Sequence, residues 1–387
     1  MLTKPGNSRI MKREFLDPTG AVILIQFLNS FVGGVLTVTL PLLMIERNID
    51  VVTIGLIFAA MPLIFQLTRM FLAIVSDFFG RKPFFILNGL LNVVSSSIYY
   101  LAQTPLDFLF GKVMEGTTSA SLWAVNRATL LEENREKRRA LVHLRTTAYL
   151  SLALGSLLAG FLIVWILYEK TLMLCIFIGA TVVPLSLLLA TEKRKKFSVR
   201  KALRYLDLRR KEKTFKIFLL LFLVMGLSFG FRSGYVFPLF LSGNGFDTET
   251  IGVLLGLQTL LAGFFLYFFT RKIRIDKLML LSGSSYSALF ILLSFSSYVS
   301  AAFLVVAYGA VDGLLGGGVE GILSKITREE SYGTDIGLLM MGLHFGTTIS
   351  LAISGLLISL WGFAAPFLLS ALVLVAFYIT AYSILKG

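Results

Sequence analysis

The sequence predicts an all-α integral membrane protein whose chain crosses the bilayer twelve times. Three observations support this: the overall composition, the spacing of long apolar runs, and the position of the basic residues between those runs. Of the 387 residues, 56% are hydrophobic and 15% are charged, whereas a soluble domain has roughly 45–50% apolar and about 25% charged residues. Too little polar surface remains to enclose so many apolar side chains, so we expect lipid to cover much of this chain.

Twelve apolar runs follow one another along the chain, and each is long enough to cross a bilayer core as a helix of about 20 residues. The first run is too long for a cleavable signal and has no small-residue cleavage pattern, so we expect it to remain in the membrane. The predicted helices lie at 20–45, 52–76, 83–103, 106–130, 141–167, 171–190, 215–241, 250–269, 278–297, 300–324, 333–360 and 364–385.

The basic residues predict the orientation of these helices. With both termini in the cytoplasm, 31 of the 36 Lys and Arg residues fall in cytoplasmic segments or the adjoining ends of the runs, and 2, Arg47 and Lys170, in external ones. Cytoplasmic connections of membrane proteins carry such an excess. We therefore expect a multi-pass protein of the plasma membrane with both termini cytoplasmic. The formal net charge of +14 lies mostly in segments between the apolar runs, so we expect these basic residues to contact anionic membrane lipids and not nucleic acid.

A strongly basic segment, 191–214, divides the runs into two sets of six. The predicted domains are an N-terminal six-helix bundle at 1–190, a cytoplasmic basic linker at 191–214 and a C-terminal six-helix bundle at 215–387. The linker has two interpretations. Its apolar residues can anchor an interfacial helix on the inner leaflet, or the segment can be a solvated tether.

The two sets of six runs also resemble each other in sequence. Glu115-Gly116 in the fourth run and Asp312-Gly313 in the tenth occupy matching positions in the two halves. Parallel six-helix repeats of this kind are typical of a large class of secondary transporters.

The turn between the second and third runs carries the most specific pattern, Ala73-Ile-Val-Ser-Asp77-Phe-Phe-Gly80-Arg81-Lys82-Pro83. It resembles the cytoplasmic motif of the major facilitator superfamily (MFS) in its acid, its second glycine and its basic pair, and departs from it at Ala73 and Phe78. The resemblance covers essentially the full chain. It implies two six-helix bundles, related by a pseudo-two-fold axis, around a central cavity that the first, fourth, seventh and tenth runs line.

The resemblance further implies a gate on the cytoplasmic side. Either basic residue of the turn could pair with an acid at the end of run four, and Asp77 could meet the positive N-terminal end of run eleven. Gly80 supplies the backbone freedom for the sharp turn. The alternative is an ordinary basic turn without a gating role. The predicted gating residues are Asp77, Gly80, Arg81, Lys82, Glu132 and Glu133.

Six charged residues fall inside the predicted helices, where a charge costs ~2.5–3.5 kcal/mol at the membrane centre. Lys112 and Glu115 are three residues apart on one helix face, so a local ion pair is one interpretation and a role with substrate or protons is the other. The six are Asp312, Glu320, Glu115, Lys112, Arg232 and Arg69.

Depth in the membrane suggests further pairs among these six. Asp312 lies near the midplane within reach of Arg232, and Glu320 lies at the same depth as Arg69. Such pairs can be purely structural. A carboxyl that loses its partner can instead take up a proton near neutral pH, and we rank Asp312 first for that role. The middle of run one offers only amide side chains at the depth where many family symporters have an acid.

Other polar side chains inside the runs are candidates for solute contact, although interhelical hydrogen bonds would also explain them. They are Asn29, Gln66, Trp123, Asn126, Gln258 and His344. Glycines recur at four-residue intervals in runs seven and ten. We expect close helix packing in run seven, and a bend at the Gly316-Gly317-Gly318 triplet of run ten.

These observations favour a secondary transporter that moves a small organic solute by alternating access, with protons as the candidate coupling ion. The 34 Phe residues give a slight preference for efflux of amphipathic, drug-like compounds. The alternative is uptake of a sugar or metabolite by a proton symporter or uniporter. Run five carries Gly155-Ser-Leu-Leu-Ala159-Gly160, which resembles the antiporter pattern of the family without its proline and one glycine, and this weighs against proton antiport.

The remaining function classes lack their typical residues. The chain has one Cys and two His, too few for a thiolate or histidine metal centre, so we expect no metal and no cofactor. No nucleophile–base constellation marks a membrane enzyme, and no pore-lining ring marks a channel. A transporter-like sensor is the other outside alternative. We expect a monomer that is not an enzyme.

Overall fold

The computed structural model describes residues 18–133, 137–189, 208–269, 273–327 and 332–386. These residues form helices and their connections, without strands. The first half holds α1 (Pro18–Glu46), α2 (Val51–Phe79), α3 (Lys82–Leu101), α4 (Pro105–Glu133) and α5 (Lys137–Leu187). After a single 3-10 turn, Leu208–Arg210, the second half holds α7 (Lys213–Gly230), α8 (Val236–Gly243), α9 (Thr248–Phe269), α10 (Ile275–Ser294), α11 (Tyr298–Ile326), α12 (Tyr332–Trp361) and α13 (Ala364–Lys386).

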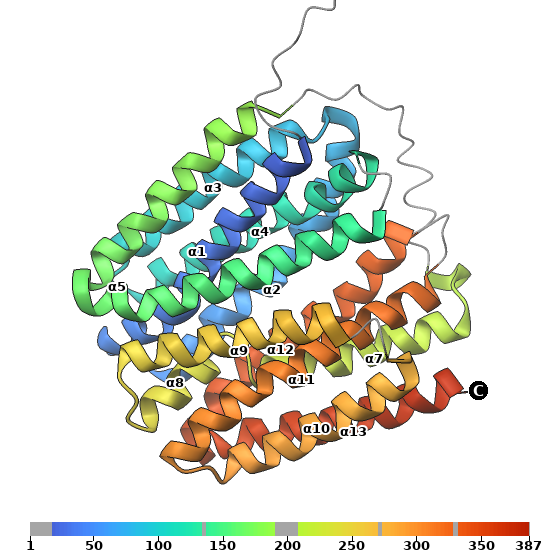
Figure 1. Ribbon diagram of the computed structural model, residues 1–387. Coiled ribbons are helices and arrows are strands. Elements are labelled where there is room, and N and C mark those ends of the chain that lie inside the picture. The colour runs from blue at the N-terminus through green and yellow to red at the C-terminus, as the bar shows by residue number, and fades with distance from the viewer. Residues whose placement is uncertain (1–17, 134–136, 190–207, 270–272, 328–331, 387) are drawn as a thin grey trace, which may run out of the picture.

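The twelve predicted crossings are confirmed, although the seventh is interrupted. Ten described helices are long and apolar enough to span a membrane. One of the ten, α5, crosses twice, because its backbone reverses at Leu167 (φ 69°, ψ 167°), the turn at the left of Figure 1. The less apolar α4 has 29 residues, about 43 Å of helix, and makes the twelfth crossing. The seventh predicted run is divided into α7 and α8.

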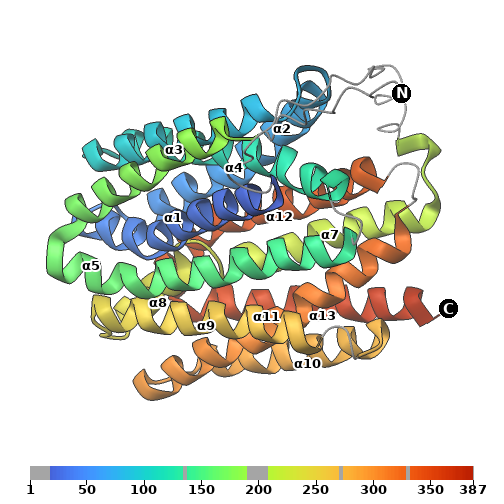
Figure 2. The same cartoon turned by 45° about the horizontal axis from the view of Figure 1, so that its top comes forward.

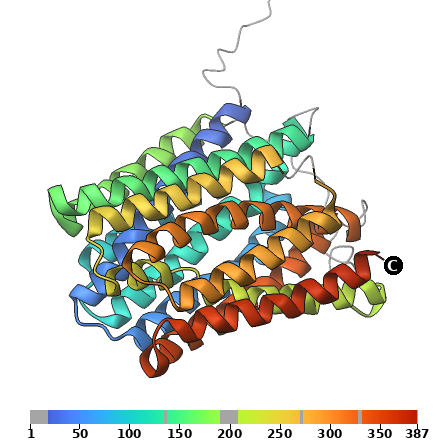
Figure 3. The same ribbon diagram turned by 60° about the horizontal axis from the view of Figure 1, so that its bottom comes forward.

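The helices form two bundles, α1–α5 and α7–α13 (Figures 1 and 2). In the first bundle, α1 packs along α5 and α2 along α4; in the second, α7 packs along α12 and α9 along α11. Two helix pairs join the bundles: α5 with α9, seen side by side in Figure 3, and α2 with α12. The predicted limits of the two domains remain predictions, because most of the linker 191–214 lies outside the described residues.

The bundles have two chemically different ends. We call the end where α1 begins and α13 ends the basic side; it carries Lys82, Lys137, Lys213 and Arg274. We call the other end, with the Leu167 turn and α8, the far side (Figure 1). This separation of charge follows the predicted distribution of basic residues.

On the far side the two bundles touch backbone to backbone. A Cβ atom added to Gly160 of α5 would lie 2.6 Å from the carbonyl oxygen of Thr248 in α9. In the other helix pair, a Cβ on Gly55 of α2 would lie 2.9 Å from the carbonyl oxygen of Leu351 in α12. Small residues permit such close approach between helices in lipid. The far side is therefore closed by contacts that tolerate no larger side chain.

The two glycine-rich runs were expected to differ in packing and bending. Close packing in run seven is confirmed, since Gly226 and Gly230 face the backbone of α12. The glycine triplet of run ten does not unwind, because α11 is one helix from Tyr298 to Ile326, and the expected bend there stays a prediction. Packing of Gly309 against the backbone of α9 holds α11 on a neighbouring helix, and such tertiary contact overrides a low helix propensity.

The chain instead breaks between α7 and α8, at residues 231–235. Gly234 there has a left-handed backbone (φ 63°). Four residues later Pro238 has no N–H to donate to the carbonyl of Gly234, and a proline ring clashes with that carbonyl in a regular helix. The combination of a glycine with a proline four residues on is the sequence signal for this break.

A capping contact at the far side gives a stability prediction. Asp50 Oδ1 accepts hydrogen bonds from the backbone N–H groups of Val52 and Thr53, both at 3.0 Å, at the start of α2. Replacing Asp50 with Ala should lower the free energy of unfolding by ~0.5–2 kcal/mol, as for other N-caps. Asp50→Asn keeps an accepting oxygen and is the matched control; equal loss in both variants would contradict the capping role.

The same cap should depend on pH. The hydrogen bond from the Thr53 hydroxyl, followed by those from the backbone, lowers the pKa of Asp50 below its ordinary 3.8. A carboxyl with a lowered pKa stabilises the folded state above the unfolded pKa and loses that contribution as the pH falls through the folded value. The difference in unfolding between wild type and Asp50→Ala should therefore be present at neutral pH and shrink below about pH 4.

Candidate functional site

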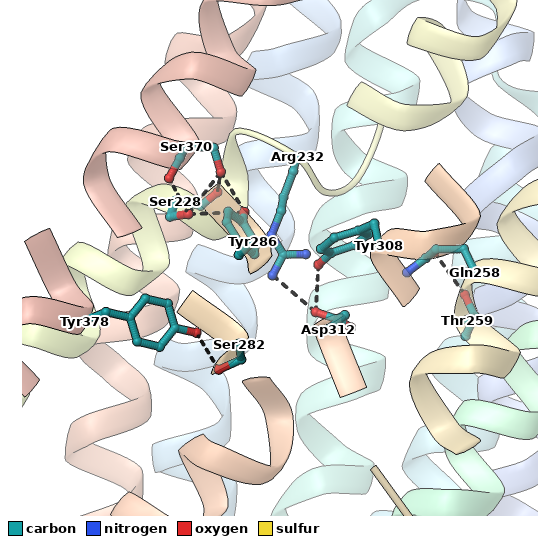
Figure 4. Close-up of polar contacts among 10 residues, drawn as sticks. All are labelled: Ser228, Arg232, Gln258, Thr259, Ser282, Tyr286, Tyr308, Asp312, Ser370 and Tyr378. Carbon is teal, nitrogen blue, oxygen red and sulfur yellow. Dashed lines mark hydrogen bonds and ion pairs between the residues drawn. The ribbon is translucent and has the colours of Figure 1, made fainter. Parts of the chain in front are cut away.

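The break between α7 and α8 places a buried ion pair inside the second bundle. Arg232 lies in the break, and its Nη2 atom is 3.3 Å from Asp312 Oδ1 of α11. The hydroxyl of Tyr308 donates to the same oxygen at 2.7 Å (Figure 4). The two charged side chains are only 5% and 17% exposed. The structure thus brings together two residues that the sequence predicted to lie within reach of each other.

Aromatic rings enclose the cation of this pair. The Arg232 guanidinium carbon lies 4.3 Å from the ring centroid of Phe229 and 4.7 Å from that of Tyr308. Its Nε atom is buried without a hydrogen-bond partner. A buried pair of this kind mostly offsets the desolvation of its own charges, and removal of one partner leaves the other charge unpaired in a low dielectric. Rearrangement of this pair therefore requires a replacement charge, a proton or water.

Next to Arg232 lies a hydroxyl network that the sequence analysis missed. The Tyr286 hydroxyl is 2.7 Å from Ser370 Oγ, and Ser228 Oγ is 3.0 Å from the same atom (Figure 4). The three residues come from α10, α13 and α7. Because they lie on separate helices, no spacing along the sequence could reveal the network. It fixes the Tyr286 ring 5.3 Å from the Arg232 guanidinium carbon.

The first bundle carries a counterpart in α4. Lys112 Nζ is 2.8 Å from Glu115 Oε2, and the Tyr99 hydroxyl donates to the same oxygen at 2.6 Å. The Lys112 ammonium lies 4.2 Å from the ring centroid of Phe58, and Phe58 contacts Tyr235 of the second bundle, with ring centroids 5.4 Å apart. Each half therefore contains a cation, a carboxylate and a tyrosine hydroxyl on one oxygen.

The third acid, Glu320 of α11, does not pair with Arg69, the partner that its depth in the membrane suggested. Its Oε1 atom pairs with Arg145 of α5 and lies 3.9 Å from Nη2 of Arg127 of α4. The sequence analysis counted both arginines with the cytoplasmic basic residues, at the ends of runs four and five. The structure begins α5 at Lys137, so Arg145 lies two turns inside the helix. The expected partner was Arg69, and this expectation is wrong.

Arg69 of α2 instead lies beside aromatic rings. Its guanidinium carbon is 5.7 Å from the ring centroid of Phe65, whose edge contacts His344 of α12 at 4.9 Å between centroids. Among the described residues, no carboxylate lies within 4.0 Å of Arg69.

Most of the predicted solute contacts take part in interhelical hydrogen bonds. Asn126 Nδ2 donates to Gln26 at 2.7 Å, and Asn29 Oδ1 accepts from Asn92 at 3.2 Å. Gln66 Nε2 donates to the carbonyl of Gly337 across the bundles at 3.3 Å. These contacts match the structural interpretation of the three residues.

The other three predicted contacts have fewer polar partners. Trp123 lies 5.1 Å below the guanidinium of Arg127, and His344 lies against Phe65. Gln258 Oε1 accepts a hydrogen bond from the hydroxyl of its neighbour Thr259 at 3.4 Å. Figure 4 shows these two residues to one side of the Arg232–Asp312 pair, without a hydrogen bond to it.

The predicted gate is only partly described. Gly80 has φ 80° and ends α2, as the sharp turn requires. Lys82 Nζ donates to the carbonyl of Leu187 at 2.6 Å, and Arg81 is buried, 8% exposed. The side chains of Asp77, Glu132 and Glu133 lie outside the described ones, so their pairing remains a prediction.

The chain is similar to known transporters in sequence pattern and in fold. A family model described as Major Facilitator Superfamily matches residues 22–319. Among solved structures, the chain is similar to the nucleoside transporter NupG, with a TM-score of 0.75 and 14% identity over 96% of this chain and 100% of that one; a point mutant of NupG gives 0.80. It is also similar to the human organic anion transporter MFSD10 (TETRAN), with a TM-score of 0.71 and 15% identity over 94% and 99% of the two chains. No curated protein matches the sequence.

Proposed function

Because this chain belongs to the Major Facilitator Superfamily of transporters, we propose that it moves a small organic solute by alternating access between its two bundles. One observation carries the proposal: the two sides differ in how the bundles meet. On the far side they meet through glycine backbones such as Gly160 against Thr248. Toward the basic side they meet through long side chains such as Arg145 with Glu320. Side-chain contacts can separate without moving a packed backbone, so the basic side is the one that opens from this state.

The orientation follows from charge. We place the basic side in the cytoplasm of a cell whose plasma membrane the chain crosses, because basic residues stay on that side during insertion. The state described here is then closed toward the outside. The chain acts in this scheme as a monomer, since each monomer holds both bundles.

Asp312 is our candidate for coupling transport to protons. It loses a stabilising partner whenever Arg232 moves, and protonation would then remove a bare charge from the bundle. The break at residues 231–235 allows that movement without unfolding a regular helix. Glu115 with Lys112 is the second candidate, in the other half.

The transported solute is proposed by class. The slight preference for export of amphipathic compounds stands beside the alternative of metabolite uptake. A nucleoside transporter and an organic anion transporter share the fold, so a nucleoside and an organic acid belong in any first panel. The inference in the next section favours the acid.

Spin-label distances test alternating access without knowledge of the solute. In a Cys175→Ser background, one pair joins Gln103 and Ser242 on the far side and a second joins Leu188 and Lys277 on the basic side. Each pair has one residue in each bundle, and all except Lys277 lie at helix ends or turns. We expect two populations for each pair, with the far-side distance long where the basic-side distance is short. Single, invariant distances on both sides across pH 5–8 would contradict the proposal.

Asp312→Asn tests the coupling role. We expect proteoliposomes with this variant to lose accumulation driven by a pH gradient, down to the level of protein-free vesicles, and to keep solute counterflow. The panel consists of uridine, benzoate and tetraphenylphosphonium. Asp276→Asn is the matched control, because Asp276 pairs with the exposed Arg274 at the start of α10. Gradient-driven accumulation that survives in Asp312→Asn would exclude this residue.

A further inference from the structure

We propose that Arg127, Arg145 and Arg69 form a binding site for an organic carboxylate, and that Glu320 occupies this site when no ligand is present. The proposal deepens the proposed function and rests on it, because it names the solute class and where its charged group binds. The site lies between the bundles, toward the basic side: Arg127 and Glu320 lie six residues from the ends of α4 and α11, about 9 Å along a helix.

The first step of the argument is the geometry around Glu320. Two arginines from α4 and α5 of the first bundle approach one oxygen of this carboxylate from α11 of the second bundle. The three side chains are 29%, 27% and 39% exposed, far more than the 5% and 17% of the Arg232–Asp312 pair. Part of each of these three side chains therefore lies at the surface of the structure, whereas the Arg232 pair is enclosed.

The second step is the balance of charge. Arg69 lies close enough to Arg127 for their charges to interact, and close enough to His344 as well. No described carboxylate lies within ion-pair distance of Arg69, and the described partner of Arg145 is Glu320. Arg127 and Arg145 thus share the Glu320 carboxylate, and Arg69 adds a third cation near Arg127. Cations gathered inside a membrane protein repel one another, and an additional anion relieves that repulsion.

The third step identifies the ligand class. Guanidinium groups bind a carboxylate through two parallel hydrogen bonds, a geometry that an ammonium cannot offer. Aromatic rings lie beside two of the arginines: Trp123 at 5.1 Å from Arg127, and Phe65 at 5.7 Å from Arg69. They provide an apolar surface next to the charge. The ligand that fits is an acid with one carboxylate and an aromatic or other apolar body.

The fourth step links binding to movement. Glu320 comes from the second bundle and its arginine partners from the first, so this ion pair ties α11 to α4 and α5. A carboxylate ligand that takes the place of Glu320 releases the tie and satisfies the arginines at the same time. Binding then frees the bundles to move while the arginine charges remain neutralised.

Binding of benzoate to the full chain in zwitterionic nanodiscs tests the site. Arg127→Gln and Arg145→Gln should each weaken benzoate binding by about tenfold or more, because each removes a charge-assisted pair. Glu320→Gln should tighten it by about tenfold, because it removes the competing carboxylate. Arg274→Gln is the matched control: Arg274 is 78% exposed at the start of α10, and its loss should leave binding unchanged. Benzamide, the neutral analogue, should not bind.

Two results would overturn the site: benzoate affinity that is the same in all four variants, or weaker binding in Glu320→Gln. Two further arms separate carboxylates from phosphates. If inorganic phosphate, or phosphatidylglycerol added to the nanodiscs, binds through the same arginines and benzoate does not, the cluster is a phosphate or headgroup site and the proposal is wrong. The spin-label distances of the previous section report separately on alternating access. If those distances exchange and benzoate does not bind, only the carboxylate site fails.

Discussion

Replacing Arg232 with Ala is expected to lower the free energy of unfolding by about 3–5 kcal/mol, the usual loss when one partner of a buried ion pair is removed. Asp312 would keep a hydrogen bond from Tyr308 and lose its cation. Arg232→Ala would also leave a space between the rings of Phe229 and Tyr308. The measurement is reversible unfolding of the purified protein in mixed detergent micelles.

Two further variants separate charge from packing at this site. Arg232→Ala combined with Asp312→Asn removes both charges, and we expect it to recover part of the loss. Arg274→Ala removes an exposed arginine with an acidic partner, and the expected loss is only about 0–1 kcal/mol. If Arg232→Ala were as mild as Arg274→Ala, the buried pair would not have the energetic role that we assign to it.

Gly160→Leu should shift the protein toward a state open on the far side. A Leu side chain cannot fit where even a Cβ atom would lie 2.6 Å from a backbone oxygen of α9. Overpacking typically costs about 1–3 kcal/mol, and the closed state alone would bear it. A difference of that size changes the ratio of the two states by about 5- to 150-fold. The spin-label distance between Gln103 and Ser242 should lengthen accordingly.

Gly309→Leu is the control for the Gly160→Leu substitution. Gly309 meets the backbone of Gln258, but α9 and α11 belong to the same bundle, so the added side chain strains both states equally. We expect a lower unfolding temperature with unchanged spin-label distances. Equal distance changes in both variants would mean that the Gly160 contact has no special part in closing the far side.

The fold could be predicted almost entirely from the sequence because lipid imposes simple requirements on it. A crossing helix must be long and apolar, and its connections must be polar, so the apolar runs and the polar segments between them predicted the number of helices. The direction of the helices across the membrane stays a prediction. The discrepancy is local. The reversal at Leu167 lies where the fifth predicted run ends, whereas the break at residues 231–235 depends on Gly234 together with Pro238. The sequence analysis considered the glycine spacing alone.

The candidate site was predictable only where partners lie near each other on one helix or at depths that a side chain can bridge. Lys112 with Glu115 follows from a spacing of three residues, and Arg232 with Asp312 from depths within reach of an Arg side chain. Arg145 with Glu320 escaped because Arg145, near the start of its run, was counted with the cytoplasmic basic residues, whereas α5 begins eight residues before it, at Lys137. The hydroxyl network of Ser228, Tyr286 and Ser370 escaped because three separate helices supply it, and their lateral order is a property of the folded bundle.

The break in the seventh crossing affects how water enters on the far side. At residues 231–235 the amide and carbonyl groups lie outside a regular helical ladder, and Gly234 is covered by Phe58 of the other bundle. Groups of this kind need shelter from hydrocarbon but are readily hydrated. When the bundles separate at that point, the surface that becomes exposed to water includes backbone amide and carbonyl groups as well as apolar side chains. Hydration of those backbone groups offsets part of the free energy needed to separate the halves, so we expect the break to make opening on the far side easier.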